Sequence, residues 1–136
     1  MEISQTKELF WLTATVLMTA VFWVPYISQR ILERGLWNAL YEPQGETDTQ
    51  APWANRMMRA HANAIENLAI FAPLVLLLHA QGIATPLTAN ACAIYFFARA
   101  VHFVVFSLGM PLLRVPAFLV GFACQMAIAL ALFGWT

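Results

Sequence analysis

The strongest constraint on this chain is a set of apolar stretches long enough to cross a bilayer as helices. The stretch from Val115 to Trp135 has 21 residues without a charge, and the stretch from Leu9 to Ile27 is also uncharged. A membrane-spanning helix needs about 20 mainly apolar residues. Hydrophobic residues make up 61% of the 136 residues and charged ones 10%, whereas soluble domains have about 45–50% and 25%. We therefore predict one all-α integral membrane domain over residues 1–136, a four-helix bundle with helices near 8–30, 54–80, 86–108 and 112–135.

Charge and residue types argue against several function classes. Seven Lys+Arg and seven Asp+Glu give a formal net charge of zero, so no long-range positive field would hold nucleic acid. The two cysteines, Cys92 and Cys124, are too few for a disulfide framework, and we interpret them as packing residues because both lie in apolar sequence. Histidines, cysteines and carboxylates show no metal-ligand spacing. We expect neither a metal site nor a nucleic-acid partner.

Basic residues are concentrated on one side of the predicted membrane. Lys7 precedes the first helix, whereas four arginines flank the first and third loops: Arg30, Arg34, Arg56 and Arg114. The positive-inside rule then places these two loops in the cytoplasm and both termini on the opposite side.

Polar residues interrupt the second and third helices, where the bilayer makes them costly. Arg56, Arg59, Asn63 and Glu66 follow the +3, +4, +3 spacing of one helical face. Counting about 1.5 Å per residue from the cytoplasmic helix ends puts Glu66 about 15 Å deep and Arg99 about 12 Å deep. Each ionised group at mid-membrane costs about 2.5–3.5 kcal/mol. We therefore predict a buried Glu66–Arg99 ion pair, within a subunit or across an interface.

Two interpretations of the other polar groups stay open. Asn63 and His102, at similar depths, either hold the helices in register or contact a ligand. Arg59 and Arg114 have no carboxylate left to pair with, so an anionic ligand is the more economical explanation for them. His61 points about 200° around the helix from Arg59, and we expect it to be an interhelix hydrogen-bond partner.

These residues carry a family resemblance. The pattern R-x-x-R-x-H-x-N-x-x-E from Arg56 to Glu66, the pair Arg99-Ala-Val-His102 and the approach from Gly109 to Arg114 resemble the MAPEG family, the membrane-associated proteins in eicosanoid and glutathione metabolism. The four-span layout agrees, so the resemblance covers essentially the whole chain.

The resemblance implies a homotrimer that binds glutathione, as a co-substrate, at subunit interfaces in the cytoplasmic half of the membrane. A lipophilic electrophile or lipid would enter from the bilayer. Four residues match glutathione contacts of the family, namely Arg59, Asn63, Glu66 and His102. Arg114 matches the catalytic arginine that stabilises the thiolate, and Arg30 loosely matches a further arginine.

The departures from the family pattern narrow the activity. Ala62, Phe106 and Val115 stand where the prostaglandin-synthase branch has arginine, tyrosine and serine, so a eukaryotic eicosanoid synthase is disfavoured. The short loops look more like bacterial members, which implies a bacterial inner membrane.

We expect a glutathione transferase, with or without peroxidase activity. The alternative is a non-enzymatic lipid-binding or scaffold member with a degenerate glutathione site. Small multidrug transporters also have four short helices, but they share a carboxylate within the first helix. The first helix is uncharged here, which disfavours that class.

Overall fold

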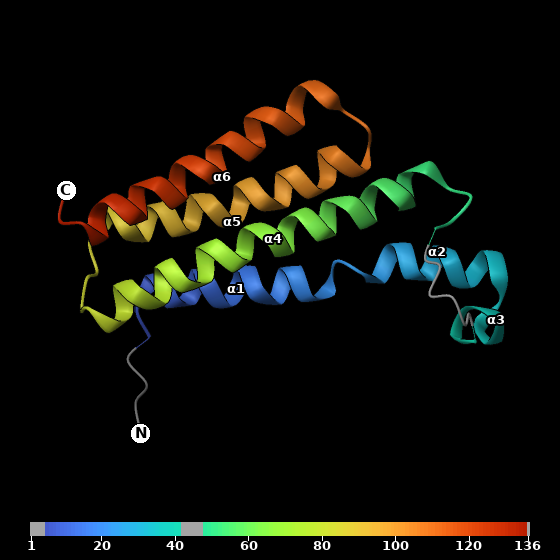
Figure 1. Cartoon of the computed structure of the whole chain (residues 1–136), viewed down its shortest axis with the longest axis horizontal. Coiled ribbons are helices and arrows are strands. Elements are labelled where there is room, and N and C mark those ends of the chain that lie inside the picture. The colour runs from blue at the N-terminus through green and yellow to red at the C-terminus, as the bar shows by residue number, and fades with distance from the viewer. Residues whose placement is uncertain (1–4, 42–47, 136) are drawn as a thin grey trace.

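The computed structural model describes residues 5–41 and 48–135, and this part of the chain is all-helical (Figure 1). The helices are α1 (Lys7–Val21), α2 (Val24–Arg34), α3 (Leu36–Leu40), α4 (Pro52–Ala80), α5 (Pro86–Ser107) and α6 (Pro111–Leu132). Four segments are long and apolar enough to cross a membrane: Lys7–Arg34, Pro52–Ala80, Pro86–Ser107 and Pro111–Leu132. The predicted all-α membrane bundle is confirmed. The centre of the predicted first loop, residues 42–47, lies outside the described residues.

The four long segments alternate in direction. Figure 1 shows α1 and the end of α4 beside the two termini, with α2, α3, the start of α4 and the α5–α6 turn at the opposite end. Helix α5 packs against α6, α4 and α1, and α4 also contacts α1 and α6. The loop ends on which the positive-inside argument rests therefore lie together, at the end of the bundle away from the termini.

The sequence predicted one helix over residues 8–30, but the structure divides this first span into two helices. Helix α1 ends at Val21 and α2 starts at Val24, with Pro25 in its first turn, where the missing N–H of a proline costs little. A side-chain contact holds the second piece to α4, because the Tyr26 hydroxyl and His61 Nδ1 lie 2.6 Å apart. The prediction that His61 makes an interhelix hydrogen bond is confirmed.

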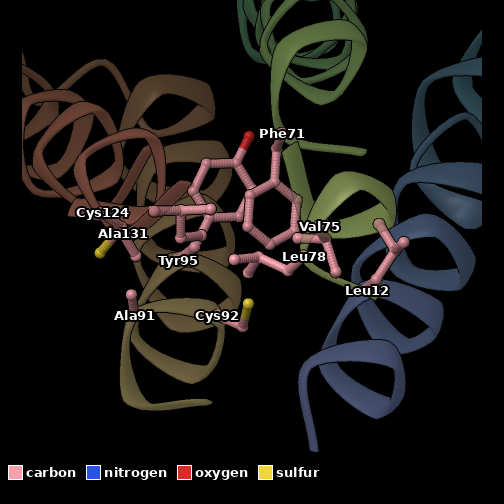
Figure 2. Close-up of a cluster of buried hydrophobic side chains, with 10 residues drawn as sticks. Leu12, Phe71, Val75, Leu78, Ala91, Cys92, Tyr95, Cys124 and Ala131 are labelled. Carbon is pink, nitrogen blue, oxygen red and sulfur yellow. The ribbon is translucent and has the colours of Figure 1, made fainter. Parts of the chain in front are cut away.

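A hydrophobic cluster fills the half of the bundle near the termini (Figure 2). The rings of Phe71 in α4 and Tyr95 in α5 stack with centroids 3.8 Å apart. Val75 and Leu78 are fully buried beside them. Both free cysteines also lie buried in this cluster, where they pack as small apolar side chains.

A buried carboxylate joins α1 to α5 at the end of the bundle near the termini. Glu8 is only 3% exposed, and its Oε1 accepts a hydrogen bond of 2.5 Å from the Thr88 hydroxyl. Glu8 lies in the first turn of α1 and Thr88 in the first turn of α5. Two helix N-termini, whose dipoles favour a negative charge, therefore flank this carboxylate.

We expect the Thr88→Val variant to unfold at a lower temperature in detergent. Hydrogen bonds to charged groups contribute about 1.5–3 kcal/mol, and valine leaves the Glu8 carboxylate without its donor. The matched control is Thr13→Val, because the Thr13 hydroxyl donates only to the Leu9 carbonyl of its own helix. Equal Tm values for the two variants in thermal denaturation would contradict this role.

Candidate functional site

Three predicted ligand contacts lie on a face of α4 that is largely open in the single chain. Arg59 and Glu66 are exposed, and Asn63 is half-buried. Ala60 and Ala64, each one residue further along, are buried in the second hydrophobic cluster instead. The sequence spacing thus produces a polar stripe that is open to whatever lies beside the subunit. We call Arg59, Asn63 and Glu66 the α4 stripe.

Arg99 lies inside the bundle and has a different partner from the predicted one. It is 2% exposed, and its Nη2 donates to Asn63 Oδ1 at 2.6 Å. Among the described residues no ion pair joins Arg99 to Glu66, whose side chain points away from the bundle. The predicted Glu66–Arg99 pair is therefore not formed within one subunit. The same pair across a subunit interface stays a prediction.

Two further amides extend this contact and were not predicted as part of the site. Asn67 Nδ2 donates to the Asn63 carbonyl at 2.9 Å and to Asn63 Oδ1 at 3.3 Å. Gln125 of α6, 1% exposed, donates from Nε2 to the Asn67 carbonyl at 3.2 Å. The available signal was an amide inside an otherwise apolar helix, since such a group must find a partner across helices.

His102 and Arg30, two of the predicted contacts, are buried within the single chain. His102 is 4% exposed, and its ring lies 5.6 Å from the Phe106 ring and 6.2 Å from the Phe118 ring, between centroids. Arg30 in α2 is 6% exposed. His102 Nδ1 and Arg30 Nε have no hydrogen-bond partner among the described residues. The structure does not place either side chain on the open α4 stripe.

Arg114, the predicted catalytic residue, is exposed at the start of α6. Its guanidinium carbon lies 5.1 Å from the centre of the Phe106 ring, within the range of a cation–π interaction. This ring positions the guanidinium without occupying its N–H donors. An anion at the N-terminus of α6 would also meet the positive end of the helix dipole.

Arg56 was grouped with the site by its spacing, but the structure gives it a different task. Its Nε donates to the Ser107 carbonyl at 2.9 Å, at the C-terminal end of α5, where carbonyls lack helical partners. Gly109 follows with a φ of +76°, a conformation that side chains rarely adopt. A Cβ there would lie 3.2 Å from the Arg56 guanidinium. Arg56 therefore fastens the start of α4 to the α5–α6 turn.

The fold is that of a multi-pass membrane protein, with arginine and amide side chains that extend from the middle of α4 to the start of α6. The family comparison matches the model of the MAPEG family over residues 9–134. The chain therefore belongs to the MAPEG family, as its motifs predicted. Comparisons with curated proteins and with solved structures give no match.

Replacing Arg56 and Arg59 of α4 one at a time distinguishes the structural role of the first from the open position of the second. Arg56→Leu removes a charge-assisted hydrogen bond and should lower the free energy of unfolding by about 1.5–3 kcal/mol. Arg59→Leu should change it by no more than about 0.5 kcal/mol, because the Arg59 side chain is exposed. Chemical denaturation of both variants in the same detergent measures the difference. A stability loss in Arg59→Leu equal to that in Arg56→Leu would contradict the assignment.

Proposed function

We propose that the protein is a membrane-bound glutathione transferase, which joins the glutathione thiolate to lipophilic electrophiles. The observation that carries the proposal is the α4 stripe, where Arg59 and Glu66 are exposed and Asn63 is half-buried, its amide oxygen accepting from Arg99. Glutathione has two carboxylates, an ammonium and peptide carbonyls. The planar fork of Arg59 fits a carboxylate, Glu66 supplies a carboxylate for an N–H donor, and Asn63 orients the peptide. His102 and Arg30 would contact the ligand only where it reaches into the subunit.

Arg114 is the proposed catalytic residue. A free thiol has a pKa of about 8.5 and only the thiolate is nucleophilic, so a guanidinium at the sulfur raises the reactive fraction at neutral pH. The thiol proton leaves to water, and the sulfur lone pair forms a bond to the electrophilic carbon. In a substitution, the leaving group departs with the electrons of the broken bond. An apolar electrophile reaches this end of the bundle from the surrounding lipid.

The same stripe supports the proposed homotrimer. Glu66 is exposed near the middle of the 29-residue helix α4, and a charge facing lipid at mid-membrane costs about 2.5–3.5 kcal/mol. A second and third copy would cover this face and could bring Arg99 or another cation to the carboxylate. We place the arginine-rich end in the cytoplasm of a bacterium, with the protein in the inner membrane, because basic loops remain inside. Cytosolic glutathione would then have direct access.

A specific observation also favours the alternative, a non-enzymatic lipid-binding or scaffold protein. An apolar groove of ≈ 450 Å³ runs between α5 and α6, lined by residues that include Phe97, Val101, Val105 and Pro116. Such a groove would hold an acyl chain without any chemistry at a thiol.

Detergent-purified protein decides between the two functions. We expect isothermal titration calorimetry to detect glutathione binding, and the absorbance of the conjugate to report turnover with an aryl halide such as chlorodinitrobenzene. S-methylglutathione is the control, since it keeps the peptide groups but has no thiol to conjugate. A protein that binds neither peptide and gives no conjugate would overturn the transferase proposal and leave the lipid-binding one.

Arg114→Ala tests the catalytic assignment. Glutathione affinity should be largely kept, while the thiolate absorbance of bound glutathione disappears and turnover falls by a factor on the order of 10² or more, as for loss of a charge-stabilising donor. Arg114→Lys should recover only part of the rate, because an ammonium lacks the planar fork. Unchanged thiolate absorbance and turnover in Arg114→Ala would remove this residue from the mechanism.

A further inference from the structure

The contact with Arg99 fixes which end of the Asn63 side-chain amide is the oxygen and which is the nitrogen. Arg99 Nη2 lies 2.6 Å from Asn63 Oδ1. A guanidinium has five N–H donors and no acceptor, so the atom it meets must be the oxygen of the amide. A flipped Asn63 would place its own NH2 against these donors. Because Arg99 is 2% exposed, water cannot readily replace the amide oxygen as its partner.

A second donor uses the remaining capacity of the same oxygen. Asn67 Nδ2 lies 3.3 Å from Asn63 Oδ1 and 2.9 Å from the Asn63 carbonyl. Both of these atoms are acceptors, so the orientation of Asn67 is fixed as well. The carbonyl of Asn67 in turn accepts from Gln125 of α6. A carbonyl oxygen has two lone pairs, and Asn63 Oδ1 has neither left for a ligand.

The side-chain nitrogen of Asn63, unlike the oxygen, has hydrogen-bonding capacity left. Within residues 5–41 and 48–135, Asn63 Nδ2 makes no hydrogen bond, and it is not among the buried atoms that lack a partner. Asn63 is half-buried on the α4 stripe, one turn from Arg59 and from Glu66. The part of the amide that faces outward is therefore a donor of two N–H groups.

We propose that Arg99 is a positioning residue, which locks the Asn63 amide so that it can only donate a hydrogen bond to the ligand. The ligand atom at Asn63 is then a carbonyl or carboxylate oxygen, and an ammonium or amide N–H at that point is rejected. This identification of the ligand atom rests on the proposed glutathione site. The lock itself does not, because it is a property of the ligand-free protein.

The ligand-free protein tests the lock directly. The chain has five asparagines, so ¹⁵N-asparagine labelling gives a small set of side-chain amide signals, of which Asn63 is assigned with Asn63→Gln. Arg99→Met should shift the Asn63 side-chain signal, and Arg99→Lys, which keeps a donor, should largely restore it. Tyr95→Phe is the matched control, one turn away on the same helix, and should leave the signal unchanged. An Asn63 signal that is the same in Arg99→Met and in wild type overturns the lock.

Asn63→Asp tests the direction of the ligand bond. Aspartate can still accept from Arg99 and Asn67, so the fold and the Tm should be kept, but it offers no N–H to the ligand. We expect the Kd for glutathione to rise about tenfold or more, and the rise to persist in 1 M salt, where charge repulsion at an accessible site is screened. Wild-type affinity in Asn63→Asp, or its recovery at high salt, overturns the donor assignment. If wild-type protein binds no glutathione, the proposed function fails, and the ligand-free spectra alone decide whether Arg99 locks the amide.

Discussion

The hydrogen bond between Arg99 and Asn63 determines which part of the protein faces outward. A guanidinium inside a bilayer has no water to satisfy its donors, and leaving it unpaired costs several kcal/mol. The bond joins α5 to α4 at one level and so fixes the rotation of α4 about its own axis. With Asn63 turned toward Arg99, Arg59 and Glu66 are left on the outer side. The open stripe thus follows from the one hydrogen bond that Arg99 makes to α4, while its Nε has no partner among the described residues.

Helix ends hold the bundle together at both membrane boundaries, and the charges there match the helix dipoles. The Glu8 carboxylate lies between the N-termini of α1 and α5, whereas the Arg56 guanidinium lies at the C-terminus of α5. A negative charge is favoured at the first kind of end and a positive charge at the second. Hydrophobic contacts in lipid provide no comparable direction, because lipid tails are as apolar as the side chains. These polar contacts therefore set the register that the apolar cluster alone would leave undetermined.

The sequence predicted the long helices, because length and composition suffice for them. It predicted that His61 contacts a neighbouring helix, because the helical period places His61 on a different face of the helix from Arg59. It did not predict that Arg99 meets Asn63, since depth arithmetic gives the level of a residue and not its direction. Three residues turn a helix by about 300°, so Glu66 faces about 60° away from Asn63. Pro25 indicated a kink at the end of the first helix, and α2 does begin there. The cap made by Arg56 depends on a tertiary contact that spacing does not encode.

The contact between Arg114 and Phe106 is compatible with the proposed role of Arg114, although Phe106 departs from the family pattern. A phenyl ring attracts the guanidinium with about 0.5–1 kcal/mol at an exposed site, yet it accepts no conventional hydrogen bond. Within residues 5–41 and 48–135 the Arg114 guanidinium makes no hydrogen bond, so its N–H donors are open to an anion. A tyrosine here would add a hydroxyl that could bind the peptide, and Phe106 cannot supply it. In the proposed glutathione site, recognition then depends more heavily on the α4 stripe of Arg59, Asn63 and Glu66.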